Sequence, residues 1–195
     1  MSPEPQRPDI ARDLLAGVQA AERNWHLPVA ERAKATAAEI STMRHLDRAN
    51  AHVLRRIVLT HGWPGRSLVG EEAARAAWLI ALHADDDPAF QLSALRLINE
   101  AVRHGEATLQ QWAHLYDRCC VHQGRPQLYG TQHRYGPAGL VPHPIAEPHN
   151  LDARRASVGL PPYAERAERI RRHHTGHPTT DPPGPAEPLT GRCSA

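Results

Sequence analysis

Apolar side chains recur at helical spacing along most of this chain. The first predicted helix carries its apolar residues four positions apart, at Ile10, Leu14 and Val18. An Ala-rich helix is expected after Pro28, and a further apolar stretch runs through residues 53–58. Gly62 and Pro64 follow that stretch, an order typical of a helix end, because glycine accepts a left-handed backbone and proline prevents the helix from resuming.

The same spacing predicts three more helices, over residues 67–84, from Pro88 to Gly105, and from Leu109 into Asp117. Asp87 precedes Pro88, which is the usual pairing of an N-cap acceptor with a first-turn proline. This part of the chain therefore predicts helices joined by short turns.

The helical period stops after Gly124. The region near residues 125–148 is rich in Gly, Pro, Tyr and His and has no regular apolar spacing. It predicts a small β-hairpin or an irregular excursion, with Gly136 and Gly139 in the turn.

Both ends of the chain differ from its middle. Residues 1–8 and 174–195 are polar and Pro-rich, so they cannot bury enough apolar surface to offset the entropy of ordering, and we expect them to be disordered. Residues 9–173 are expected to form a single mainly α domain, a compact bundle of about six helices. Its last two helices are short, one capped by Asn150 and one opened by Pro161.

Composition limits the partners. The formal net charge is only +2, so no strong field favours nucleic acid, and nucleic-acid binding is not expected. No apolar run approaches the length that spans a bilayer, so we expect no membrane partner. Three cysteines without a CxxC spacing indicate neither a disulfide framework nor a zinc ribbon. We therefore expect the protein to be located in the reducing cytoplasm. The oligomeric state and any cofactor stay open.

Six short motifs follow one another between residues 61 and 160. They read His-Gly-Trp-Pro at 61–64, Leu-Val-Gly at 68–70, Leu-His-Ala-Asp at 82–85, Leu-Tyr-Asp-Arg at 115–118, Gln-Leu-Tyr-Gly-Thr-Gln at 127–132 and Asp-Ala-Arg-Arg-Ala-Ser-Val-Gly-Leu at 152–160. This succession resembles the bacterial family catalogued as domain of unknown function 6624, over roughly residues 45–165. Leu82 stands where the family pattern has glutamine. The resemblance locates a site and implies no particular reaction.

His61, His83 and Asp85 are candidate catalytic bases, because they titrate usefully or accept protons. Each also has a structural interpretation. His61 ends a helix, where an imidazolium interacts favourably with the helix dipole, and His83 closes a strongly apolar helix and fits a core edge. Asp85 begins a run of three acids that opposes the dipole of the preceding helix. Asp87 in that run is explained as the N-cap of the next helix, whereas no local structural role explains Asp85.

Asp117 is a fourth candidate catalytic residue, at the end of a helix where a carboxylate again opposes the dipole. Its structural alternative is a salt bridge to Arg154 or Arg155. Arg118 follows directly and points to a different helix face, so each of the two needs its own partner.

Neutral hydrogen-bonding side chains gather in the segment 127–132, which we interpret as extended, with positions 127, 129 and 131 on one face. Amides, a phenol and a hydroxyl suit the orientation of a polar substrate. The alternative is hydrogen bonding within a hairpin. The candidate substrate-binding residues are Trp63, Arg118, Gln127, Tyr129, Thr131, Gln132 and Arg155.

The leading functional hypothesis is a small-molecule-processing enzyme with hydrolase- or lyase-like acid–base chemistry, in a polar pocket around His61, His83, Asp85 and residues 129–132. The alternative is a non-catalytic binding or accessory module in which the same residues fix the fold. A second alternative is a metal-dependent phosphohydrolase, although Ala84 separates His83 from Asp85 where such enzymes have the pair contiguous. A shared pocket with perturbed pKa values would favour the enzyme.

Overall fold

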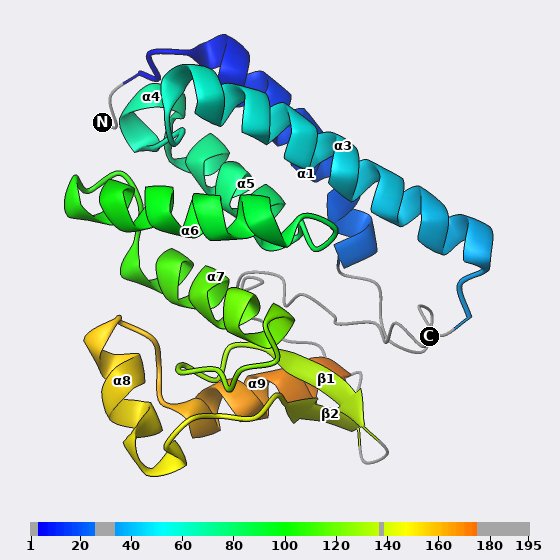
Figure 1. Ribbon diagram of the computed structural model, residues 1–195, viewed down its shortest axis with the longest axis vertical. Coiled ribbons are helices and arrows are strands. Elements are labelled where there is room, and N and C mark those ends of the chain that lie inside the picture. The colour runs from blue at the N-terminus through cyan, green and yellow to red at the C-terminus, as the bar shows by residue number, and fades with distance from the viewer. Residues whose placement is uncertain (1–3, 26–33, 137–138, 175–195) are drawn as a thin grey trace.

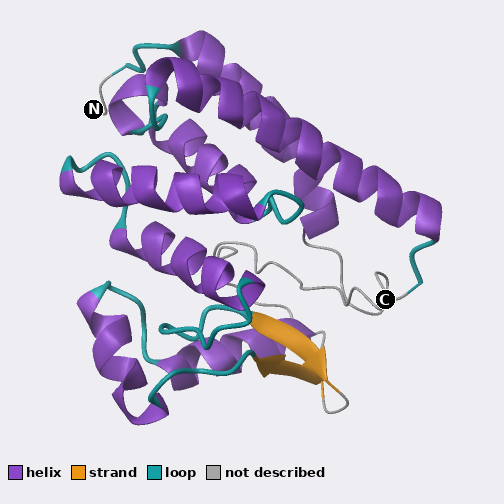
Figure 2. Cartoon of the chain, viewed as in Figure 1, coloured by secondary structure: helices purple, strands orange, loops and turns teal. Residues whose placement is uncertain are grey.

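The computed structural model describes residues 4–25, 34–136 and 139–174. It confirms a mainly α bundle with one small hairpin (Figures 1 and 2). The principal helices are α1 (Pro8–Trp25), α3 (Ala37–His61), α5 (Glu71–Leu82), α6 (Pro88–Arg103) and α7 (Leu109–His122). Helices α1 and α3 pack on each other and on α5, and α6 packs on α7. The hairpin and the last helices lie beyond α7, away from α1 and α3 (Figure 1).

Helix α5 is the centre of the main core. Nine of its twelve residues are buried, from Ala73 to Leu82, because neighbouring helices pack against several of its faces. The helix predicted over residues 67–84 is in fact two helices. Helix α4 (Arg66–Val69) stops at Gly70, whose φ of 81° lies in the left-handed region that glycine tolerates, and α5 starts on the next residue.

Two helix ends predicted from the sequence, the start of α6 and the end of α3, are confirmed. The Asp87 side chain accepts the backbone N–H of Phe90 at 3.0 Å, and Pro88 occupies the first turn of α6. Helix α3 ends at His61, and the Gly62 N–H donates to the Val58 carbonyl. Thr108 and Gln111 form a capping box at the start of α7.

The last layer consists of the hairpin and the C-terminal helices. Strands β1 (His133–Gly136) and β2 (Gly139–Pro142) are antiparallel, with Gly136 opposite Gly139. A 3-10 turn, η1 (Pro148–Asn150), precedes α8 (Leu151–Ser157) and α9 (Tyr163–His174). Asn150 occupies the predicted N-cap position of α8, but its side chain makes no capping bond to that helix. Instead, Asp152 accepts the Tyr163 N–H at 2.7 Å and joins α8 to the start of α9.

The predicted disordered ends lie partly outside the described residues, which leave out 1–3 and 175–195. Within the N-terminal segment, the backbone N–H groups of Gln6 and Arg7 donate to the carbonyls of Ser67 and Leu68. These residues therefore dock on α4. Across the described ranges, no helix has the length and apolar character needed to cross a membrane.

Candidate functional site

The predicted site residues do not all converge. His61 is exposed at the end of α3, with its Nε2 3.2 Å from a guanidinium nitrogen of Arg7, and Trp63 packs against the main core. Both belong to the α1–α3–α4 side of the molecule, away from the layer that holds the segment 127–132 (Figure 1). The structure therefore leaves His61 and Trp63 outside the polar groups described below.

Asp85 lies in the turn between α5 and α6 and binds a buried arginine of α7. Arg118 donates from Nε to Asp85 Oδ1 at 2.9 Å and from a terminal nitrogen to Oδ2. The Arg118 side chain is 1% exposed and that of Asp85 is 40% exposed. Burial works to raise the pKa of Asp85, but the charge and hydrogen bonds of Arg118 outweigh it, so the pKa is lowered and the carboxylate is ionised.

His122, which sequence reasoning missed, completes this cluster. Its Nδ1 is 2.8 Å from Gln91 Oε1, and its Nε2 is 3.5 Å from Asp85 Oδ1. The Gln91 amide nitrogen donates to the carbonyls of Ala81 and Leu82, which assigns Oε1 as the acceptor. In neutral His122 the proton is therefore on Nδ1, and Nε2 faces the Asp85 carboxylate as a second acceptor. We call Asp85, Gln91, Arg118 and His122 the Asp85 cluster.

His83 borders the Asp85 cluster but packs as an aromatic residue. It is the C-cap of α5, is buried, and stacks on Trp25 with ring centroids 4.1 Å apart and an interplanar angle of 5°. Its electrostatic interaction with Asp85 contributes to the lowered pKa of that carboxyl group. One face of the His83 ring is thus covered by Trp25 at the end of α1.

Asp117 lies on another face of α7 and anchors the segment 127–132 through its backbone. Its fully buried carboxylate accepts the N–H groups of Leu128, Tyr129 and Thr131 at 2.8–3.1 Å, and the Thr131 hydroxyl at 2.9 Å. Burial raises its pKa in spite of these hydrogen bonds. Its hydrogen-bond partners are these loop groups, and no ion pair of Asp117 with Arg154 or Arg155 is found in the described part of the chain.

The segment 127–132 is a closed loop, which corrects the extended segment expected from its sequence. The Gln127 side chain donates to the carbonyls of Gln132 and His143, both at 2.9 Å, and accepts the Gln132 N–H at 2.8 Å. Gly130 turns the chain with a φ of 65°, and a Cβ there would come within 3.1 Å of the Tyr163 ring. Gln132, which is fully buried, accepts a bond from Arg118 at 3.4 Å and so connects the loop to the Asp85 cluster.

Two arginines of α8 hold the carbonyl groups of the same loop. Arg154 Nε donates to Leu128 O at 2.8 Å, and Arg155 donates to Tyr129 O at 2.5 Å and to Pro161 O at 2.7 Å. The Tyr129 ring packs edge-on against Trp112, with ring centroids 6.0 Å apart. The loop is therefore fixed from both sides, and Tyr129 is part of a small aromatic core.

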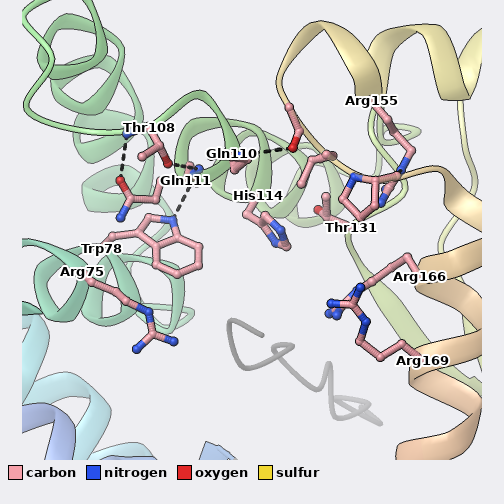
Figure 3. A pocket seen from close by; sticks show the side chains of 13 residues that line it. Arg75, Trp78, Thr108, Gln110, Gln111, His114, Thr131, Arg155, Arg166 and Arg169 are labelled. Atoms are coloured by element: carbon pink, nitrogen blue, oxygen red, sulfur yellow. Dashed lines mark hydrogen bonds between the residues drawn. The ribbon is translucent and has the colours of Figure 1, made fainter. Parts of the chain in front are cut away.

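A pocket of about 310 Å³ opens beside this loop, between α5, α7 and α9 (Figure 3). We call it the arginine pocket. Four of its lining residues are arginines, and none of the described lining residues is acidic. The lining consists of Arg75, Trp78, Thr108, Gln110, Gln111, His114, Thr131, Arg155, Gly159, Leu160, Pro161, Arg166 and Arg169. Thr131 and Arg155 are the only predicted site residues among them.

His114 is the inner titratable group of the arginine pocket. It is 5% exposed, and its ring meets Trp78 edge-on with centroids 5.8 Å apart. Burial, with further contributions from Arg166 and Arg155, lowers the pKa of His114 to about 3. The imidazole is therefore neutral at physiological pH. Nothing in the sequence distinguishes His114 from His122, the other histidine of α7, because the environment of His114 comes from α5, α8 and α9.

The arginines at the outer part of the pocket come from two helices that are distant in sequence. Arg75 on α5 is exposed, whereas Arg166 and Arg169 on α9 are half-buried. Within the described part of the chain, no ion pair is found for Arg75 or Arg169. The signal that could have revealed the site is the spacing of three between Arg166 and Arg169, which puts both on one face.

The arginine pocket and the Asp85 cluster are suited to different chemistry. The arginine pocket can hold an anion, because guanidinium groups donate to carboxylate and phosphate oxygens. The Asp85 cluster has two acceptors that face each other and can share a proton. Over the described ranges, no group of three or more His, Cys, Asp or Glu side chains is arranged to hold a metal ion.

Comparison with known proteins adds one result. A family model described as a family of unknown function, DUF6624, matches residues 8–175. No curated protein and no solved structure matches the chain.

Proposed function

Because this chain belongs to DUF6624, a family of unknown function, we propose its function from the site: the protein binds a small anionic molecule in the arginine pocket. The observation that carries the proposal is a cavity of about 310 Å³ lined by four arginines with no acidic residue among its described lining.

Charge supports this proposal. A guanidinium about 4 Å from an anion contributes about 4 kcal/mol at an effective dielectric constant of about 20, before desolvation of the two ions is subtracted. Arg75 and Arg169 have no carboxylate partner among the described residues, so an anion would not have to displace one from them. On the same wall, the Gln110 amide donates one N–H to the Gly159 carbonyl and has a second N–H that can complete the coordination of an oxygen atom.

The arrangement of the walls also supports a binding site. The Thr131 side of the pocket is fixed by the buried Asp117 carboxylate, and the Arg155 side by bonds to Tyr129 and Pro161. A ligand therefore meets walls that are already held in place, which lowers the entropy lost on binding.

Thermal unfolding in the presence of small anions tests the proposal. At equal ionic strength, inorganic phosphate or benzoate should raise the melting temperature relative to chloride, since a ligand of the native state stabilises it. Arg169→Gln should remove most of this increase. Arg56→Gln is the matched control, because Arg56 is exposed on α3 and does not line the pocket. Equal responses of the two variants would contradict the proposal.

The second candidate function is a small-molecule-processing enzyme with hydrolase- or lyase-like acid–base chemistry, and the observation that favours it is the Asp85 cluster. Gln91 orients His122 so that Nε2 of the neutral ring is an acceptor 3.5 Å from Asp85. Burial and the charge of Arg118 lower the pKa of His122, although Asp85 opposes them, so the ring is available as a base near neutral pH.

A hydrolysis screen with phosphate and carboxylate esters tests this second candidate. Any turnover should depend on a basic group with a pKa below the ordinary value of about 6.5 for histidine. His122→Gln should abolish that turnover, whereas His104→Gln, at the exposed end of α6, should leave it unchanged. Turnover that survives in His122→Gln would exclude His122 as the base.

A further inference from the structure

Resting on the proposed function, we propose that the anion bound in the arginine pocket carries a planar aromatic ring, which enters first and leaves the anionic group among the outer arginines. The ligand class is thus an aromatic phosphate ester or an aromatic carboxylate. Four features of the pocket lead to this inference.

The first feature is size. A cavity of about 310 Å³ lies at the lower end of the range of about 300–1,000 Å³ for small-molecule pockets. An inorganic anion alone would leave most of it to water. The remaining volume is suitable for one ring system.

The second feature is the inner wall. Trp78 is 3% exposed, and its indole N–H donates to the Gln111 carbonyl at 2.9 Å. Trp78 therefore offers the pocket carbon atoms and no free donor. Leu160 and Pro161 add apolar surface from the segment after α8. A flat apolar group is the occupant that such surfaces stabilise by burial.

The third feature is His114, which lies beside Trp78 and is neutral. A neutral imidazole can pack against a ring or exchange one hydrogen bond with a ring substituent. It adds no charge to the inner part of the pocket, so that part favours an uncharged moiety.

The fourth feature is the position of the cations. Trp78, His114 and Thr131 are buried, whereas Arg75 is exposed and Arg166 and Arg169 are half-buried. Figure 3 shows the guanidinium groups of Arg166 and Arg169 close together, with that of Arg75 across the pocket from them, below Trp78. The fourth arginine, Arg155, is buried, but its guanidinium donates to the carbonyls of Tyr129 and Pro161. The other three lie at the outer part of the pocket, so a matching ligand has its ring and its anion at opposite ends. Arginine also packs well against aromatic faces.

Isothermal titration of the full chain with matched probes tests this inference. Methyl phosphate and phenyl phosphate carry the same anionic group, and acetate and benzoate form a second pair that differs only in the ring. We expect each aromatic member to bind at least tenfold more tightly than its aliphatic partner. Comparison of the two pairs decides between a phosphate ester and a carboxylate.

Two variants test which part of the pocket binds the ring and which part binds the anionic group. Leu160→Ala, at a half-buried position, should reduce the advantage of phenyl phosphate over methyl phosphate at least threefold and leave methyl phosphate binding unchanged. Arg169→Gln should weaken both probes by a similar factor. Trp78→Phe retains a ring at this buried position and serves as a second inner-wall variant if Leu160→Ala unfolds.

Failure of this inference and failure of the proposed function give different experimental results. Equal affinity of the aliphatic and aromatic probes would contradict the proposed aromatic ring of the ligand, but not the proposed anion site. An aromatic advantage that is unchanged in both inner-wall variants would also overturn this inference. Binding of uncharged phenol as tight as that of phenyl phosphate, or no binding by any probe, would overturn the proposed function itself.

Discussion

Asp117 Oδ2 accepts both the backbone N–H and the side-chain hydroxyl of Thr131, at 3.0 and 2.9 Å. Thr131 lines the arginine pocket, whereas Asp117 is fully buried behind it. Asp117 therefore shapes one wall of the pocket without facing a ligand. This geometry supports a positioning role for Asp117, in place of the catalytic role considered from its sequence.

Asp117→Asn should destabilise the fold strongly. The substitution replaces a carboxylate oxygen by an NH₂ group that faces backbone N–H donors of the loop 127–132. Hydrogen bonds to a charged group contribute about 1.5–3 kcal/mol each, so the loss of two predicts a decrease of about 3 kcal/mol or more in the free energy of unfolding. Urea denaturation measures it. Asp86→Asn, which breaks an exposed ion pair with Arg48, is the control and should cost under about 1 kcal/mol. If the two variants are equally stable, the anchoring role of Asp117 is wrong.

His114 should make stability depend on acid pH. Its pKa is about 3 in the folded protein and about 6.5 when unfolded, so the unfolded chain binds more protons between these values. Stability attributable to His114 is complete above pH 6.5 and is lost as the pH falls toward 3. The expected loss between pH 7 and pH 5 is about 2 kcal/mol. His114→Gln removes this titration, so its free energy of unfolding should fall by about 2 kcal/mol less over the same interval. Parallel pH profiles of the two proteins would contradict the lowered pKa.

Tyr129→Phe and Gln132→Leu should differ in their effect on the free energy of unfolding. Among the described residues the Tyr129 hydroxyl has no hydrogen-bond partner, so its removal should change the free energy of unfolding by less than about 0.5 kcal/mol. Gln132 is fully buried and bonds to the Thr131 hydroxyl, the His114 carbonyl and Arg118. Its replacement leaves buried polar partners unsatisfied and should cost about 2–3 kcal/mol. Thermal and urea unfolding check both values, and a stable Gln132→Leu variant would show that the loop does not depend on these bonds.

Local signals predicted much of the fold. Asp87 with Pro88 predicted the start of α6, and Gly62 with Pro64 predicted the end of α3, because capping depends on a few consecutive residues. The break at Gly70 was missed, because an isolated glycine inside a helical pattern is often tolerated.

The candidate site was harder to predict, because its partners are distant in sequence. Arg118 was expected to bind substrate, yet its partner Asp85 comes from the turn before α6. Thr131 and Arg155 were identified from their motifs, but the pocket they line also needs Arg75 and Arg169 from α5 and α9. Periodicity shows which face of a helix an arginine occupies. It does not show which other helix shares the same cavity.

The central claim is that the arginine pocket binds an anion, and calorimetric titration of phenyl phosphate into two double variants tests it most directly. Arg75→Gln/Arg169→Gln removes two pocket cations, whereas Arg44→Gln/Arg56→Gln removes two exposed cations of α3 and changes the net charge equally. We predict that the pocket variant loses at least tenfold in affinity while the α3 variant binds like the unaltered protein. An equal loss in both variants, or no loss in the pocket variant, would contradict the claim.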